Sequence, residues 1–293
     1  MEYYSFNQYL RDTFGTKVYK IALDGGFTCP NRDGTLGTRG CIFCSGRGSG
    51  EFAQPSELSI TEQLEQGKQR VAAKINESGK YIAYFQAFTN TYAPVEHLRK
   101  LYMEALEMPD VAAVSIATRP DCLPEEVLDL LEELNHIKPV WVELGLQTIH
   151  ERTADYIRRG YPLTVYDQAV QALRVREIEV ITHVILGLPG ETEQDMLATV
   201  DYVGKSGVQG IKLQLLHVIE GTDLAEEYRQ GVFSCMTLEE YVDLVCRAIA
   251  LLPENMVIHR MTGDGDKKTL IAPLWSADKK RVLNALNKRL RES

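Results

Sequence analysis

Three cysteines near the N-terminus have a spacing suited to binding metal. Cys29, Cys41 and Cys44 form a C-x11-C-x2-C pattern within residues 24–50, a segment rich in glycine, asparagine, aspartate and proline. This composition predicts a loop. A closed structural zinc site uses four ligands, whereas an iron–sulfur cluster held by three thiolates leaves one iron open to another ligand. The pattern therefore favours an iron–sulfur cluster with an open coordination position.

Zinc is the alternative interpretation of the same cysteines. It needs a fourth ligand, for which Cys122 or His97 is available, although neither has a spacing that pairs it with the Cys-x-x-Cys pair.

The sequence has no apolar run of signal-peptide or membrane-span length. The six cysteines are therefore expected to be reduced thiols, and the protein is expected in the cytoplasm with no membrane partner.

The composition excludes some classes of protein. The chain has 293 residues, of which 44% are hydrophobic and 25% charged, so it is long enough to bury a full core and is not disordered. Its formal net charge of −9 argues against a surface that attracts nucleic acid or anionic lipid everywhere. A local basic patch remains compatible with this charge.

The elements that must position these cysteines follow a repeating order. Short β-prone runs are predicted at 18–23, 80–88, 111–118, 139–147, 179–187 and 210–217. Helical patterns follow them at 61–77, 94–108, 124–136, 164–177, 191–205 and 237–252. Six βα units in a row imply a parallel sheet with helices outside. Residues 256–263 can add an edge strand, and 278–290 have the pattern of a terminal amphipathic helix.

The two faces of several strands differ in polarity. In the strand at 139–147, one face is wholly apolar, and the other carries Glu143 and Gln147. Lys212 and Gln214 share a face of the sixth strand in the same way. A flat sheet covered on both sides prefers continuous apolar strands, whereas a polar or small inner face fits an open barrel whose lumen holds a ligand.

The predicted fold is therefore α/β, a six-stranded partial (β/α)6 barrel similar to a TIM barrel, with a C-terminal helical extension. Residues 1–255 form the barrel, and residues 256–293 form a strand and a basic helix that close it. The loop at 24–50 follows the first strand and so lies at the carboxyl end of the sheet, where barrel enzymes hold their chemistry.

Several motifs resemble those of one enzyme family. The loop ends in Cys-x-aromatic-Cys and precedes six βα units, an arrangement similar to that of the radical S-adenosylmethionine (SAM) enzymes. Six further segments resemble one branch of these enzymes, the YhcC/YtqA-type bacterial branch, which is also called MnmL and is related to the elongator catalytic subunit. These segments are GSGEFA, TRPDCL, VELGLQT, RRGY, LGLPGET and HRMTGD. The eleven-residue gap between the first two cysteines is wider than the three-residue gap usual in the superfamily.

The resemblance implies cofactors, partners and a reaction. The cofactors are a [4Fe–4S] cluster and SAM, whose reductive cleavage gives a 5′-deoxyadenosyl radical, and the partner is an external one-electron donor such as flavodoxin or ferredoxin. The implied substrate is tRNA, in which carboxymethylaminomethyl-uridine at the wobble position becomes aminomethyl-uridine. Two alternatives stay open: a radical SAM enzyme for a small molecule or peptide, and a zinc-binding RNA adaptor without catalysis.

The resemblance also suggests residues that contact the cofactor. Phe43 would sit against the adenine, or else pack the loop onto the barrel. Gln86 ends the second strand, where the superfamily often has a Gly-Gly-Glu motif for the methionyl amine; the match is one of position only. Arg159 resembles an arginine that binds the methionyl carboxylate, and Arg158 can exchange roles with it. Ser115, on the small-residue face of the third strand, is also assigned to cofactor binding.

A carboxylate within a strand points to a partner or a ligand, because burying it alone is costly. We expect Glu143 to contact ribose or substrate, and a structural ion pair with Arg119 or Lys212 is the alternative. Glu143 and Lys212 are the predicted catalytic residues, and Glu143 and Gln147 are predicted to bind the cofactor as well. Gln147 shares the strand-end position of barrel active sites.

Two glycines, Gly187 and Gly190, close the fifth strand. Without side chains they permit a flat ring such as adenine to approach the backbone, or they simply form a tight turn. His183 shares its strand face with Gly187, but a lone strand histidine is more often a core residue. Arg260 and Asp264 are predicted at the open side of the lumen, where a structural pair is the simpler interpretation.

The C-terminal segment 267–291 is strongly basic, with Asp278 as its only acid. A basic terminal helix can be merely solvated, but such segregation in an acidic chain favours contact with a phosphate backbone. The residues predicted to bind nucleic acid are Lys267, Lys268, Lys279, Lys280, Arg281, Lys288 and Arg289.

Overall fold

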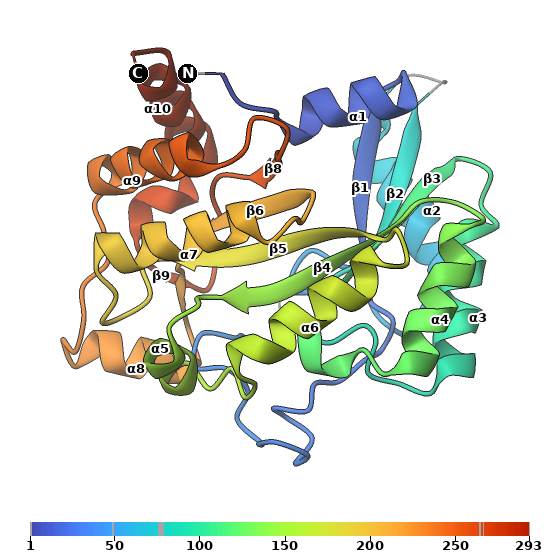
Figure 1. The fold of residues 1–293 in the computed structure, drawn as a ribbon, viewed down its shortest axis with the longest axis horizontal. Coiled ribbons are helices and arrows are strands. Elements are labelled where there is room, and N and C mark those ends of the chain that lie inside the picture. The colour runs from blue at the N-terminus through green and yellow to red at the C-terminus, as the bar shows by residue number, and fades with distance from the viewer. Residues whose placement is uncertain (1, 49, 76–78, 264, 266, 293) are drawn as a thin grey trace.

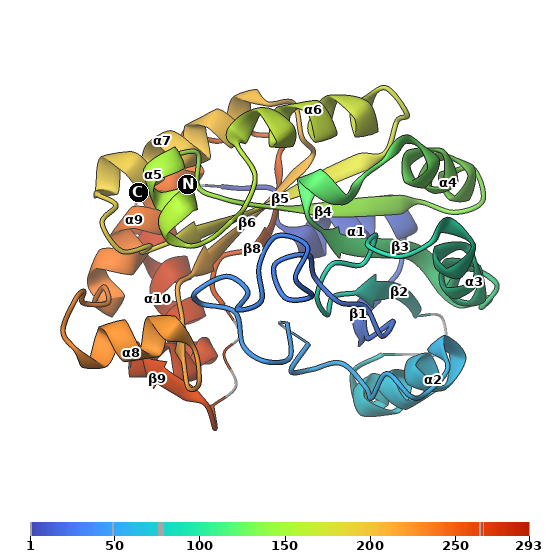
Figure 2. The same ribbon diagram turned by 90° about the horizontal axis from the view of Figure 1, so that it is seen from below.

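A computed structural model of the chain describes all residues except 1, 49, 76–78, 264, 266 and 293. Its centre is a curled sheet of parallel strands in the order β1-β2-β3-β4-β5-β6-β8. These strands are β1 Val18–Leu23, β2 Lys80–Phe85, β3 Val111–Thr118, β4 Val140–Gln147, β5 Glu179–Leu186, β6 Gly210–Leu215 and β8 Val257–Arg260. Figure 2 shows the helices on the outer, convex side of this half-barrel.

The outer helices follow the strands in chain order (Figure 1). They are α2 Ile60–Val71, α3 Val95–Leu106, α4 Glu125–Asn135, α6 Leu163–Arg174, α7 Glu193–Lys205 and α9 Leu238–Leu251. The smaller elements are α1 Phe6–Phe14, α5 Glu151–Tyr156, α8 Asp223–Arg229, α10 Lys279–Glu292, and a pair of short strands, β7 Val218–Ile219 and β9 Leu270–Ala272. Short 3-10 turns lie at Ala72–Lys74, Pro120–Cys122 and Leu274–Ala277.

The predicted partial barrel is confirmed, with one strand more than six. The run predicted at 256–263 supplies β8, which pairs in parallel with β6 and forms the edge of the sheet. The connection from β6 to this seventh strand contains β7 and α8 in addition to the outer helix α9. The proposed domain boundary at residue 255 stays a prediction. Strand β8 lies beyond this boundary but belongs to the same sheet as the rest of the barrel.

Local sequence signals set the starts of three outer helices. The side chains of Ser59, Thr192 and Thr237 each accept a hydrogen bond from a backbone N–H three residues later, and an acidic side chain at that later position bonds back to the cap. Such capping boxes satisfy two amide groups that would otherwise be left unpaired at the helix end.

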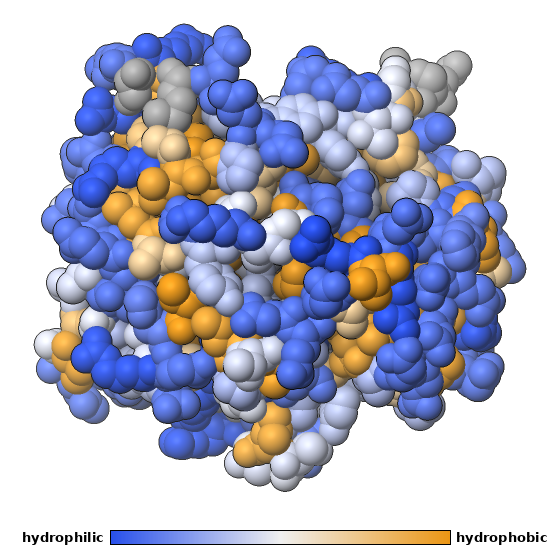
Figure 3. All heavy atoms as spheres, viewed as in Figure 1, coloured by the Kyte–Doolittle hydropathy of each residue, from blue (hydrophilic) through white to orange (hydrophobic). Residues whose placement is uncertain are grey.

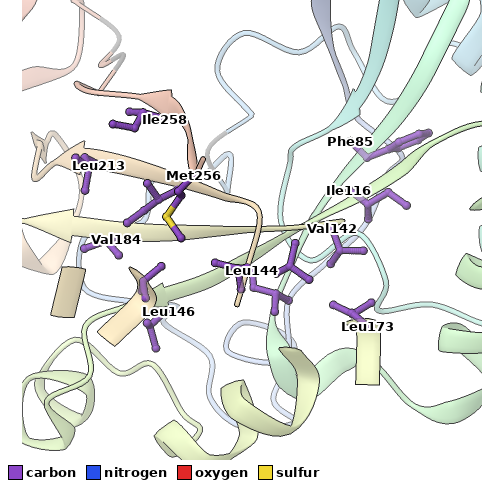
Figure 4. Packing of buried hydrophobic residues seen from close by; sticks show 14 of the residues in the cluster. Phe85, Ile116, Val142, Leu144, Leu146, Leu173, Val184, Leu213, Met256 and Ile258 are labelled. Atoms are coloured by element: carbon purple, nitrogen blue, oxygen red, sulfur yellow. The ribbon is translucent and has the colours of Figure 1, made fainter. Parts of the chain in front are cut away.

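The core lies between the convex face of the sheet and these helices. Val142, Leu144 and Leu146 of β4 are fully buried there and pack with Leu173 of α6 and other apolar side chains (Figure 4). Burying one such side chain stabilises the fold by about 1.5–3 kcal/mol. The apolar face predicted for this strand is therefore the helix-covered face, so the polar face lines the lumen.

Helix α1 closes the N-terminal end of the lumen, a role that the sequence analysis did not predict. Its aromatic residues Phe6, Tyr9 and Phe14 surround Trp141 of β4, with ring centroids 5.7–6.4 Å apart. His259 of β8 stacks on Phe6 at 4.3 Å. The aromatic side chains of α1 thus cover this end of the sheet.

The outer surface is mixed in polarity. The face drawn in Figure 3 is mostly hydrophilic, with an apolar area over α9. No helix in the described part of the chain is both long and apolar enough to span a membrane.

Candidate active site

The cysteine loop, residues 24–50, lies within the concave side of the half-barrel (Figure 2). Cys29, Cys41 and Cys44 line one cavity of about 190 Å³, which we call the cysteine cavity. Arg32 holds the loop together, because its guanidinium donates to the carbonyl oxygens of Cys44 (2.9 Å) and Ser45 (2.6 Å). The structure thus brings the three predicted ligands to one site.

The surroundings of the thiols suit an anionic metal group. Burial raises the pKa of Cys41 and raises that of Cys44 to about 12, while nearby guanidinium groups oppose the shift: Arg119 and Arg158 at Cys41, and Arg32 at Cys44. Metal binding deprotonates a coordinating thiol. The same arginines would then offset the negative charge of the bound thiolates.

The ligand geometry separates a cluster from a single zinc ion. Across the described residues, no three His, Cys, Asp or Glu side chains are placed to hold one metal ion. In a [4Fe–4S] cluster each thiolate binds a different iron, and the three cysteines line one cavity. Neither Cys122 nor His97, the proposed fourth zinc ligands, is among the residues that line this cavity. The donor set fits the cluster.

Five predicted cofactor residues line the cysteine cavity: Phe43, Gln86, Glu143, Gln147 and Arg159. Phe43 lies between the ligands and also packs against a small apolar group beside β5 and α8, so both of its proposed roles are compatible with its position. Gln86 follows β2, and Gln147 ends β4. Gln147 has a φ of +64°, and Phe88 in the same cavity wall has a φ of +61°. Such strained non-glycine residues are concentrated at functional sites.

Arg159 is buried, and backbone carbonyls occupy most of its guanidinium. It donates to the oxygens of Leu146 (3.2 Å), Thr148 (2.6 Å) and Tyr161 (3.0 Å). A further contact of 3.3 Å joins it to Glu151. These bonds shape the end of β4, and binding of the methionyl carboxylate by Arg159 stays a prediction.

Other predicted cofactor residues lie away from the cavity walls. Ser115 is fully buried, and its hydroxyl donates a hydrogen bond of 2.7 Å to the carboxylate of Glu143, which helps to hold that carboxylate in place. Gly187 and Gly190 have φ values of +96° and +81°, as tight turns require, and a Cβ on Gly187 would lie 2.9 Å from Met236. None of the three glycine and serine residues lines the cysteine cavity, so their contact with a cofactor stays a prediction.

Each strand of the sheet contributes a polar side chain to the lumen. We call this set the polar layer: Lys20, Tyr84, Ser115, Glu143, His183, Lys212 and Arg260. Lys20 and Tyr84 were not among the residues predicted from the sequence. A lysine between apolar residues in the strand Val18–Leu23 was the signal that could have found Lys20.

Glu143 is the centre of the polar layer. It is 1% exposed and forms ion pairs with both Lys20 and Lys212. It also bonds to the imidazole of His183 at 2.7 Å. The suggested ion pair with Arg119 is wrong, because Arg119 pairs with Asp121 at 2.8 Å. Lys212 is thus the predicted partner that the structure confirms.

Burial and neighbouring charges shift the pKa values of several groups in this layer. Burial by itself raises the pKa of Glu143, but the two ammonium groups hold that pKa well below its ordinary value. Burial lowers the pKa of Lys212 to about 7, with the nearby Lys20 and Arg260 acting in the same direction. Burial and Lys212 lower the pKa of His183 to about 4. Neutral His183 then donates from Nε2 to Glu143.

Acidification is expected to destabilise the protein through His183. Its pKa is about 4 in the folded state against 6.5 ordinarily, so between these values the unfolded chain binds a proton that the folded chain lacks. Stability is therefore complete above pH 6.5 and falls by about 3 kcal/mol as the pH reaches 4. Urea unfolding of the wild type and of His183→Gln between pH 7 and pH 4 measures this slope. The variant should lose much of the slope, whereas His136→Gln, on the surface, should keep it.

Two further cavities continue the lumen. One of about 500 Å³, the seam cavity, lies along the edge between β1 and β8 and is lined by Lys20, Tyr84, Lys212 and residues of α10. The other, of about 230 Å³, lies near Phe43. Gln86 and Arg260 line all three cavities, and the role of Arg260 at the open side of the lumen stays a prediction. The predicted partner Asp264 lies outside the described residues.

Comparison with known proteins agrees with this site. Residues 34–203 match the Radical SAM superfamily, and residues 208–292 match the Radical_SAM C-terminal domain. The protein YtqA of Bacillus subtilis is 49% identical over 98% of this chain and 89% of its own length. YhcC of Escherichia coli is 39% identical over 95% of this chain and 89% of its own length.

More distant relatives share part of the chain or its fold. A tRNA uridine(34) acetyltransferase of Methanocaldococcus jannaschii is 27% identical over 52% of this chain, which is 28% of that protein. The structure of Methanocaldococcus infernus Elp3 with an N-terminal deletion has a TM-score of 0.69 and 18% identity. It covers 94% of this chain, and the chain spans 63% of that structure. Because the superfamily match spans more than half of the chain and near full-length relatives reach 49% identity, the chain belongs to the radical SAM superfamily of enzymes, which use a [4Fe–4S] cluster and SAM.

Proposed function

We propose that this enzyme modifies the 5-position side chain of wobble uridine in tRNA and converts carboxymethylaminomethyl-uridine to aminomethyl-uridine. The observation that carries the proposal is that the lumen beside the three cysteines continues into the seam cavity, whose rim includes Lys279 of the basic helix α10. The name of one relative, a tRNA uridine(34) acetyltransferase, supports the same nucleotide. We place the reaction in the cytoplasm, with flavodoxin or ferredoxin as the electron donor.

The residues of the cysteine cavity have separate tasks in this proposal. Cys29, Cys41 and Cys44 hold the cluster, and Phe43 and Gln147 form walls against which SAM is held. When bound, the cluster and SAM supply a carbon-centred radical that removes a hydrogen atom from the substrate. The loop lies on the concave side of the half-barrel, where shielding from water would protect such a reactive species.

The predicted catalytic pair has unequal access to the lumen. Glu143 is enclosed by Lys20, Lys212, His183 and Ser115, so we assign it to positioning the lysines. Both Glu143 and Lys212 line the cysteine cavity, but of the two only Lys212 also lines the seam cavity. We therefore assign contact with the substrate to Lys212.

The basic helix α10 separates its two kinds of side chain. Val282, Leu286 and Leu290 are buried against the body of the protein, and the basic side chains are exposed. Its first turn carries Lys279, Lys280 and Arg281, where the helix dipole favours anions. Three basic side chains at the N-terminal end of a helix interact unfavourably with the helix dipole, and their presence there supports a role in binding phosphate.

The other residues predicted to bind nucleic acid differ in how far nearby acidic groups offset their charge. Arg289 pairs with Asp243 at 2.7 Å, and Lys288 lies 4.0 Å from Glu292, so part of their charge is offset. Lys267 and Lys268 are exposed in the segment before β9. The tRNA proposal relies most on the first turn of α10, because its Lys279 lines the seam cavity.

Removing the charge of this turn is expected to weaken tRNA binding. The triple change Lys279→Gln, Lys280→Gln and Arg281→Gln should lower the slope of log affinity against log salt by about 2–3, because each phosphate contact releases about 0.7–0.9 of a counterion. Filter binding at several salt concentrations measures it. Replacing Lys100 and Lys205, exposed on α3 and α7, should leave the slope unchanged. Deleting the segment is a poorer test, since the buried stripe of α10 would be lost.

The reaction itself is tested by nucleoside analysis. tRNA from a strain that lacks the gene should accumulate carboxymethylaminomethyl-uridine and lack aminomethyl-uridine, and the purified enzyme with SAM and reductant should reverse this under anaerobic conditions. Unchanged wobble uridines would contradict the proposal. SAM cleavage that bulk tRNA does not stimulate would favour a small-molecule or peptide substrate. Membership of the superfamily already excludes the zinc-binding adaptor.

A further inference from the structure

The walls of the seam cavity carry charge of one sign. Among the described residues that line it, Lys20, Lys212, Arg260 and Lys279 are basic and none is acidic. This contrasts with the chain as a whole, whose net charge is −9. A cavity with such walls in a low-dielectric interior attracts an anionic ligand.

The positive charge extends to the bottom of the cavity. Lys20 and Lys212 share the single carboxylate of Glu143, so two ammonium groups face one negative charge. Lys212 also donates to the hydroxyl of Tyr84 at 3.1 Å. Arg260 is close enough to disfavour the charged form of both lysines. A second anion would relieve this repulsion.

Two buried polar atoms on the same cavity lack partners within the described structure. They are Nδ1 of His259 and Oγ1 of Thr262, and both residues line the seam cavity. Thr262 is 1% exposed. Buried polar atoms in native proteins are nearly always hydrogen-bonded, so unpaired ones beside a cavity mark a place for a polar ligand.

We propose that the seam cavity binds a carboxylate at the end of the substrate side chain, held by Lys212 and Arg260 with Lys20 behind them. This inference rests on the proposed function and names the group that the enzyme selects. A backbone phosphate is flanked by ribose on both sides and cannot reach the polar layer, whereas a terminal carboxylate on a flexible side chain can. The product, which keeps only an amine, is a cation and is repelled by the same walls.

The test compares three RNA ligands on the reconstituted enzyme with SAM and no reductant. Anticodon stem-loops carry carboxymethylaminomethyl-uridine, its neutral primary amide, or aminomethyl-uridine, and fluorescence anisotropy gives each Kd. The wild type should bind the acid at least about tenfold more tightly than the amide, the change expected for a hydrogen bond to a charged group. Lys212→Met and Arg260→Met should each bring the ratio of the amide Kd to the acid Kd close to one. Lys100→Met should keep the preference for the acid.

The outcomes separate the inference from the proposed function. Equal binding of acid and amide by the wild type overturns the inference, even if the enzyme converts tRNA. Competition by inorganic phosphate but not by acetate also overturns it. If the free carboxymethylaminomethyl nucleoside binds more tightly than its amide but no RNA is converted, the proposed function fails and the inference stands. Thermal unfolding checks each variant, and Arg260→Met serves alone if Lys212→Met does not fold.

Discussion

Replacing Cys41 or Cys44 by serine is expected to reduce 5′-deoxyadenosine formation by more than about 100-fold, because even partners outside the metal's own ligands are worth about 10–100-fold at metal sites. The hydroxyl of serine does not ionise near neutral pH and replaces a thiolate poorly as a ligand for iron. Two remaining thiols cannot hold the cluster with a single open iron. The measurements are iron and acid-labile sulfide per chain after anaerobic reconstitution, together with SAM cleavage.

The other cysteines supply matched controls. Cys122→Ser is the sharpest, because Cys122 is buried close to the same loop and was the proposed fourth ligand of a zinc site. It should keep its iron, its sulfide and its activity, as should Cys235→Ser. Full iron content in Cys44→Ser, or its loss in Cys122→Ser, would show that the ligand set is assigned wrongly.

Removing the carboxylate of Glu143 should destabilise the fold by about 3–5 kcal/mol. This is the loss typical of removing one partner of a buried ion pair, which leaves the other charge unpaired. Glu143→Gln keeps the shape of the side chain but leaves the ammonium groups of Lys20 and Lys212 buried without a counter-charge. Activity should fall with stability, since Lys212 loses the group that positions it. Urea unfolding at pH 7 measures the effect.

The pH dependence of this variant distinguishes charge from packing. The two lysines shed their protons more readily in the folded variant than in the unfolded chain, so its stability should recover as the pH rises toward the ordinary lysine pKa of 10.5. The double variant Glu143→Gln with Lys212→Met should be more stable than the sum of the single losses predicts, because one buried charge is removed. A loss below about 1 kcal/mol, the value of an exposed pair, would contradict the buried arrangement.

The fold was largely predictable because its signals are local. The alternation of strands and helices, the capping residues and the apolar face of β4 are all periodic features of the sequence, and they placed the seven strands of the sheet within a few residues. Helix α1 was missed because its role depends on Trp141 and His259, which are distant in the chain. The short helices α5 and α8 have too few turns to show a pattern.

The candidate site was predictable only in part. The spacing of the cysteines by itself indicated the cluster, because three thiols within a glycine-rich loop have few other uses. The polar alternation of the strands indicated that Glu143 and Lys212 face a lumen. Ser115 and Arg159 were assigned to the cofactor from position and resemblance, but the tertiary structure surrounds them with protein partners.

The sequence by itself therefore determined which cysteines are the candidate ligands, the order of the elements and the inward face of β4 and β6, since these depend on residue type and on periods of two and 3.6 along the chain. Only the tertiary structure decided which charges meet. Lys20, Glu143 and Lys212 come from the first, fourth and sixth strands of the sheet, and curling of the sheet brings them together. The pairing of buried charges across a barrel depends on this long-range geometry, which no local pattern records.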